Sequence, residues 1–175
     1  MSLIAYVEQY IKLAKSDATK TLGLRVGGKD IVAGDYLPLS EAVSVPEISL
    51  TTDDPAGRYV TVCVDLDGPY PSFPFLSPIL HWVQSDLQAS RSTKALTTEK
   101  PFIANYIGPG PPPGSSPHRY VFLLYNQPEE FDLKLYAPPG GKEYGNMARM
   151  RYDLAAFEEK AKLGKPIAVN YFTSN

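Results

Sequence analysis

The stretch GPGPPPGSSPHRYVFLLYNQ, from Gly108 to Gln127, consists of two halves with unlike composition. Prolines in the first half remove backbone donors and glycines permit backbone angles closed to other residues, which predicts an irregular loop. The segment 120–125 is almost wholly apolar and aromatic, which predicts a strand buried on both faces. His118 and Arg119 lie at the junction. A rigid loop that delivers a titratable residue to the mouth of a buried strand is typical of a small-ligand site.

The composition of the 175-residue chain predicts one globular domain, residues 1–175. Hydrophobic residues make up 43% and charged residues 21%, which excludes a disordered chain. The formal net charge of -2 gives no field suited to nucleic acid. No run reaches membrane-spanning length and no leader pattern begins the sequence, so we expect a cytoplasmic protein. The lone cysteine, Cys63, lies in an apolar run, so we expect a buried thiol rather than a nucleophile.

Patterns along the rest of the chain predict a mainly β protein with short helices at its periphery. Apolar residues at helical spacing predict helices over residues 3–15 and 153–163. The polar segments 85–100 and 126–147 predict loops. Alternating or continuous apolar runs predict strands at residues 22–26, 31–33, 48–50, 59–67, 79–84, 120–125 and 167–172.

Two aspartates end the clearest of these strands, residues 59–67. Apolar and polar residues alternate along it, which places Asp65 and Asp67 on one face at its C-terminal end. A proline-rich loop begins immediately afterwards at Gly68. The sequence therefore predicts one or two carboxylates beside a loop.

The chain has two histidines, His81 and His118, and each stands beside a proline-rich loop at the start of a predicted strand. If these loops and the one after Asp67 meet at one end of a sheet, they form a small concave site with two imidazoles. The glycine-rich loop adds backbone N–H groups, which bind anions. A protonated imidazole also donates to an anion, so the site suits a phosphate or carboxylate group.

The chain contains three motifs in this order: Asp65-Leu66-Asp67-Gly68-Pro69, Leu80-His81-Trp82, and Gly108-Pro109-Gly110-Pro111-Pro112 with His118-Arg119-Tyr120-Val121-Phe122. These motifs resemble those of the phosphatidylethanolamine-binding protein family. The resemblance implies a β-sandwich with peripheral short α-helices and an anion pocket for the phosphoryl group of a small ligand or phospholipid head group. It also implies a regulator, such as an inhibitor of a serine carboxypeptidase or a protein kinase.

The resemblance also implies which residues form the pocket. No catalytic residue, metal or cofactor is expected, so the protein would recognise its ligand without turnover. We expect Asp65 rather than Asp67 to contact the ligand, because Arg119 or loop N–H groups can hold a buried Asp67. The expected ligand-binding residues are Asp65, His81, Tyr106, Gly110, Pro111, Pro112, His118 and Tyr120. The expected supporting residues are Asp67, Gly68, Pro69, Trp82, Gly108 and Arg119.

The sequence departs from the family pattern at two places. Leu80 stands where animal members have a histidine. Animal members also continue into a further C-terminal helix beside the pocket, whereas this sequence ends at Asn175 and resembles fungal forms, so we expect a more open site. The family's loops contain cis peptide bonds. Gly68–Pro69 and Ser77–Pro78 stand at the corresponding places, so we expect at least one of them to be cis.

Other functions are compatible with the same residues. The two histidines and two aspartates could serve a metal-dependent hydrolase, although their dispersed spacing matches no HxH or HExxH signature. Ser115 and Ser116 precede His118, but Pro117 intervenes and no GxSxG turn is present, which argues against a serine hydrolase. His81 could instead be a core histidine that donates to a carbonyl. Inhibition of a partner through a surface patch, independently of the pocket, is a further alternative.

Overall fold

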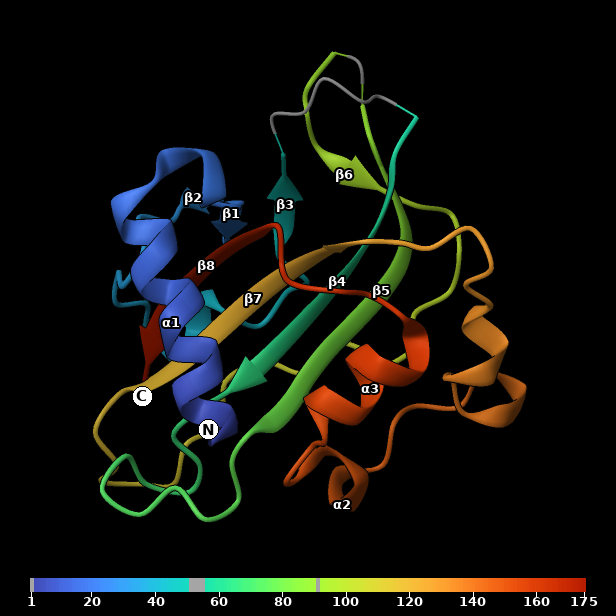
Figure 1. The fold of residues 1–175 in the computed structure, drawn as a ribbon. Coiled ribbons are helices and arrows are strands. Elements are labelled where there is room, and N and C mark those ends of the chain that lie inside the picture. The colour runs from blue at the N-terminus through green and yellow to red at the C-terminus, as the bar shows by residue number, and fades with distance from the viewer. Residues whose placement is uncertain (1, 51–55, 91) are drawn as a thin grey trace.

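The computed structural model describes residues 2–50, 56–90 and 92–175. Its centre is an antiparallel sheet in the order β6-β5-β4-β7-β8, and a smaller antiparallel sheet has the order β2-β1-β3 (Figure 1). The strands of the large sheet are β4 (Arg58–Asp65), β5 (Ile79–Ala89), β6 (Leu96–Thr97), β7 (His118–Asn126) and β8 (Ala168–Ser174). Those of the small sheet are β1 (Gly23–Val26), β2 (Lys29–Asp30) and β3 (Glu47–Ser49).

One face of the large sheet packs against the small sheet. Leu24 of β1 and Ile48 of β3 belong to the same buried cluster as Trp82, Phe122 and Phe172 from the large sheet. Alternating side chains on β5, β7 and β8 supply this apolar face, as the period-2 geometry of a strand requires. The predicted mainly β sandwich is confirmed.

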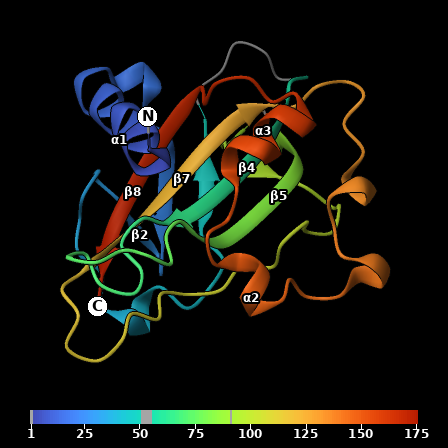
Figure 2. The ribbon, with the colours of Figure 1, turned by 60° about the horizontal axis from the view of Figure 1, so that its bottom comes forward.

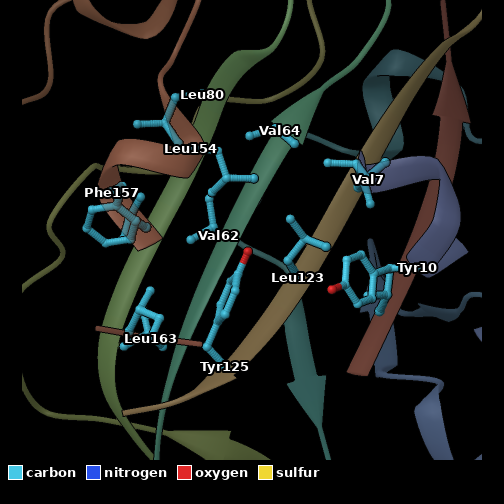
Figure 3. Packing of buried hydrophobic residues seen from close by; sticks show 14 of the residues in the cluster. Val7, Tyr10, Val62, Val64, Leu80, Leu123, Tyr125, Leu154, Phe157 and Leu163 are labelled. Atoms are coloured by element: carbon cyan, nitrogen blue, oxygen red, sulfur yellow. The ribbon is translucent and has the colours of Figure 1, made fainter. Parts of the chain in front are cut away.

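Helices cover the other face of the large sheet. Val7 and Tyr10 from α1 and Leu154 and Phe157 from α3 pack in one cluster with Leu123 of β7 (Figure 3). In the two ribbon views α1 lies across β7 and β8, and α3 lies across β4 and β5 (Figures 1 and 2). The helices are α1 (Leu3–Ser16), α2 (Asn146–Arg149), α3 (Leu154–Ala161) and the 3-10 turns η1 (Ala18–Lys20), η2 (Leu39–Glu41), η3 (Leu133–Leu135) and η4 (Pro139–Gly141). None of the described helices has the length and apolar character that crossing a bilayer requires.

The prediction of a surface loop over residues 85–100 is wrong for residues 85–89 and 96–97, which belong to strands, and residue 91 lies outside the described residues. β5 continues to Ala89 and pairs with β6. Leu87 anchors this part of the strand in the core, because it is buried although the residues on either side of it are polar. Asp86 has a φ of 56° in mid-strand, and its amide donates to Gln127 Oε1 at 2.7 Å. This irregularity breaks the alternation by which a strand is recognised.

The strand predicted at residues 31–33 is also displaced. The two-residue strand β2 lies at Lys29–Asp30 and pairs with β1 across a glycine turn. Both Gly27 and Gly28 have positive φ, 57° and 82°, so the chain reverses within these two residues. The other predicted helices and strands lie where expected, with ends that differ by a few residues.

Candidate functional site

The His118–Asp65 pair lies where two neighbouring strands meet. β7 begins at His118 and β4 ends at Asp65, and the antiparallel register places Asp65 opposite Tyr120. His118 Nδ1 lies 2.8 Å from Asp65 Oδ2, and the two side chains are buried. An ionised carboxylate only accepts, so Nδ1 carries the proton and Nε2 faces the rest of the site.

Ser115 forms a hydrogen bond with the other ring nitrogen of His118. Its Oγ lies 2.9 Å from His118 Nε2 and also 2.9 Å from the carbonyl oxygen of Ser116. One hydroxyl proton cannot serve both acceptors. When Ser115 donates to Nε2, the imidazole is neutral; when Ser115 donates to Ser116, Nε2 must donate to Ser115 and the imidazole is charged. The second arrangement is an ion pair with Asp65.

His81 has a different environment from His118. Its Nδ1 donates to the carbonyl oxygen of Ile107 at 2.8 Å, as the core-histidine alternative proposed. Burial lowers the pKa of His81, so this imidazole is neutral at pH 7. With Nδ1 committed as a donor, Nε2 of His81 is an acceptor. When Nε2 of His118 carries a proton, the two imidazoles therefore offer opposite chemistry.

Tyr120 brings the two histidines together. Its ring stacks on His118 with centroids 6.4 Å apart and meets the edge of His81 at 5.0 Å. Its hydroxyl is buried and makes no hydrogen bond of ordinary geometry with any described residue. Burial raises the pKa of this hydroxyl, and the nearby Gly110 amide opposes the shift. A buried hydroxyl without a partner is costly, and a ligand oxygen would relieve that cost.

Asp67 is held by Arg119, one of the partners that the sequence suggested for it. Its carboxylate accepts from the backbone amide and Nε of Arg119 at 2.8 Å each, and from the far guanidinium nitrogen at 2.7 Å. Arg119 also donates to Glu8 of α1 at 2.8 Å. The predicted alternation does not extend to Asp67 because β4 ends at Asp65, where the chain turns away. The two neighbouring carboxylates therefore bind different partners.

The remaining predicted residues differ in their contacts and exposure. The Tyr106 hydroxyl donates to the carbonyl oxygen of Ala42 at 2.9 Å, and its ring meets Trp82 edge-on at 6.2 Å. A side chain at Gly108 would crowd the same carbonyl at 3.0 Å. Gly110 is exposed, whereas Pro111 and Pro112 are half-buried.

The loop after Asp67 begins and ends with cis peptide bonds. Gly68–Pro69 and Ser77–Pro78 are both cis, where at least one was expected. Any side chain at Gly68 would collide with the Ile79 side chain. The Gly68 amide donates to Ser77 Oγ at 2.8 Å, which closes the base of the loop.

Arg149 is a residue of the site region that sequence reasoning missed. It is 1% exposed, and its guanidinium donates to the carbonyl oxygens of Leu80, Tyr144 and Asn105 and to Asn105 Oδ1 at 2.6–3.2 Å. These contacts fix the backbone immediately before His81 and the segment that carries Tyr106. No local motif marks Arg149, because most of its partners are backbone carbonyls and two of the partner residues, Leu80 and Asn105, are distant in sequence.

The metal-binding alternative finds no geometric support. Within residues 2–50, 56–90 and 92–175 no group of three His, Cys, Asp or Glu side chains is placed to hold a metal ion. Cys63 is buried, and burial raises the pKa of its thiol, as expected for a packing residue.

Comparison with known proteins adds a family match. Residues 26–172 match the family model described as phosphatidylethanolamine-binding protein. "Phomoidride biosynthesis cluster protein N" of Talaromyces stipitatus is 32% identical over 162 residues, which cover 83% of this chain and 78% of that protein. Protein FLOWERING LOCUS T of Arabidopsis thaliana is 30% identical over 152 residues, covering 87% and 78%.

Solved structures share the fold. The carboxypeptidase Y inhibitor, solved in complex with its cognate proteinase, superposes with a TM-score of 0.72 at 22% identity and covers 96% of this chain and 95% of that one. A phosphatidylethanolamine-binding protein from Plasmodium vivax has a TM-score of 0.66 at 19% identity, covering 94% and 96%.

Proposed function

Because this chain belongs to the phosphatidylethanolamine-binding protein family, we propose that it is a binding and regulatory protein that recognises an anionic group at His118 without chemical turnover. The ligand is the phosphoryl group of a phospholipid head group or of a similar small molecule. The observation that supports this most is the buried His118, held by Asp65 through one nitrogen and facing a displaceable hydroxyl through the other.

Each imidazole has a distinct part in the proposed recognition. Asp65 orients His118 so that Nε2 donates to a phosphoryl oxygen, which replaces the Ser115 hydroxyl. The Tyr120 hydroxyl gains the partner that it lacks. His81 is neutral and presents an acceptor, so it suits an N–H or O–H of the ligand such as the ammonium of ethanolamine.

Calorimetric titration with phosphorylethanolamine tests this proposal. His118→Ala should weaken binding by about tenfold or more, since a charge-assisted hydrogen bond is lost. Ser116→Ala is the matched control, because this exposed neighbour contributes only its carbonyl, and it should bind as the wild type does. Equal affinity in the wild type and His118→Ala would overturn the proposal.

The regulatory part of the proposal concerns a protein partner, which we propose to be a serine carboxypeptidase. The structurally similar carboxypeptidase Y inhibitor supports this choice. Inhibition of carboxypeptidase Y by the purified chain is the direct assay. If His118→Ala abolishes ligand binding but keeps inhibition, the partner contacts a surface patch independent of the pocket. Failure to inhibit this enzyme moves the search to protein kinases.

A second candidate ligand is a small organic acid. It is favoured by the similarity to the phomoidride biosynthesis cluster protein, whose name places it in the formation of a small molecule. A carboxylate makes the same hydrogen bonds to His118 as a phosphoryl oxygen does. Titration with succinate beside phosphorylethanolamine separates the two, and elemental analysis of the purified protein tests the metal-dependent hydrolase.

A further inference from the structure

The loop between β4 and β5, residues 68–78, displays aromatic side chains to solvent. Tyr70 is 43% exposed, Phe73 66% and Phe75 47%, and we call this segment the aromatic loop. No charged residue occurs within it. The rings of Phe73 and Phe75 lie side by side with centroids 5.1 Å apart. Rings gathered in this way on an uncharged loop form an apolar tip, which is a feature of interaction sites.

Backbone hydrogen bonds hold the aromatic loop in one conformation. The Phe73 amide donates to the Tyr70 carbonyl at 2.9 Å, and the Leu76 amide donates to the Gly68 carbonyl at 3.0 Å. From outside the loop, the amide of Arg151 donates to the Leu76 carbonyl at 2.8 Å. A backbone ordered in this way lowers the entropy cost of binding through the rings, because the loop does not have to be ordered first.

The aromatic loop adjoins the candidate anion site. A side chain at Gly68, the first residue of the loop, would lie 3.5 Å from Asp65 Oδ2, the atom that holds His118. Figure 1 shows this loop at the same end of the sheet as the loop that precedes His118. The apolar tip and the proposed phosphoryl site therefore face one end of the molecule.

A cation lies beside the apolar tip. The exposed Arg151 donates from Nε to the Phe75 carbonyl at 3.1 Å. Its two other guanidinium nitrogens have no hydrogen bond or ion pair with any residue among 2–50, 56–90 and 92–175. A guanidinium bound to the backbone of the aromatic loop suits a lipid surface, where the phosphates lie just outside the apolar acyl chains.

We propose that the aromatic loop docks on a phospholipid surface, with its three rings in the interface and Arg151 on a lipid phosphate. Phenylalanine and tyrosine suit the interface between lipid and water, because their rings are apolar and the tyrosine hydroxyl can still reach water. Docking brings the histidine site to the head groups, so a head group binds while its lipid stays in the membrane. Only this capture step rests on the proposed function; docking stands on the loop itself.

Co-sedimentation with vesicles of phosphatidylcholine and phosphatidylethanolamine tests the docking. Phe73→Ala/Phe75→Ala should lower the vesicle partition coefficient by about tenfold or more, because two apolar side chains leave the interface. Leu135→Ala is the matched control, since Leu135 is 64% exposed on η3 outside the loop, and it should sediment as the wild type does. Wild-type protein that stays in the supernatant, or a double variant that sediments equally, overturns the proposal.

Soluble phosphorylethanolamine separates docking from head-group recognition. The double variant should keep wild-type affinity for this soluble ligand, whereas His118→Ala should lose it and retain docking on phosphatidylcholine vesicles. Phosphorylethanolamine binding without vesicle binding leaves the proposed function standing and refutes the lipid surface. A double variant that keeps vesicle binding but no longer inhibits carboxypeptidase Y assigns the loop to a protein partner and likewise refutes the proposal.

Discussion

At the scale of single residues, hydrogen-bond partners give the two histidines of this chain different states. His118 is bound by a carboxylate on one nitrogen and a hydroxyl on the other. His81 is bound by a carbonyl and is held neutral by burial. With Nε2 of His118 protonated, the same side-chain type is a donor at one position and an acceptor at the other, which suits a ligand with an anionic and a cationic group.

Ser115→Ala tests whether the serine competes with the ligand. Removing the hydroxyl frees His118 Nε2, so we expect phosphorylethanolamine to bind about fivefold more tightly, equivalent to one hydrogen bond that no longer has to be displaced. Ser116→Ala should leave the affinity unchanged in the same calorimetric titration. Weaker binding by Ser115→Ala would mean that the hydroxyl contacts the ligand instead of competing with it.

The pH dependence of stability reports on His81. Burial lowers its pKa in the folded state below the ordinary value of 6.5. Between these two values the unfolded chain binds more protons, so the free energy of unfolding falls as the pH drops below about 6.5. Above about pH 7.5 both states are neutral and His81 adds no slope.

His81→Asn removes this titration and keeps a donor for Ile107. Urea unfolding at about pH 7.5 and about pH 5.5 should show a smaller loss of stability in the variant than in the wild type. His118 and every carboxylate are common to both proteins, so the difference belongs to position 81. Equal losses in the two proteins would show that His81 is not held neutral.

Sequence reasoning found part of the site and missed the rest for physical reasons. Asp65 and His118 stand out because each lies at the junction of a loop and an apolar strand, and the Asp67–Arg119 pair follows from the need to neutralise a buried charge. The role of Ser115 depends on the fold of a loop without regular structure. Arg149 binds mainly backbone carbonyls, which every residue has, so no residue pattern predicts its role.

At the scale of elements, strand ends and loops hold the site in place. β4 ends and β7 begins at the central pair, and β5 carries His81. Most strands were predictable from apolar runs, but the places of β2 and β6 were not. The length of β5 was not predictable either, because Asp86 interrupts the alternation and the strand continues through it. Local pattern thus located the elements, while pairing across the sheet determined where they end.

Arg149 provides a test at this scale, because one side chain joins α2 to β5 and to the segment around Asn105. Arg149→Met leaves several carbonyl oxygens buried without donors, so we expect a loss of about 3 kcal/mol or more in the free energy of unfolding. Arg25→Met, at a half-exposed arginine with one ion pair of 3.6 Å, should cost less than about 1 kcal/mol. Similar small losses in both variants by urea unfolding would show that Arg149 does not organise this region.

At the scale of the whole molecule, the small sheet and the helices close the two faces of the large sheet and leave its ends to the loops. The buried pair and the exposed aromatic loop lie at one such end. This arrangement puts the proposed recognition chemistry at the end of the sheet, where Tyr120 joins it to one of the two apolar clusters. Composition and strand patterning predicted the sandwich. Only the folded structure shows that loops far apart in sequence lie close together.

The measurement that tests the central claim most directly is a long-range proton–nitrogen NMR titration of the two imidazoles with phosphorylethanolamine. We predict that His118 Nε2 and the resonances of His81 shift together and saturably, and that His118→Ala abolishes the response of His81. If neither imidazole responds to millimolar ligand, this end of the sheet is not a phosphoryl site.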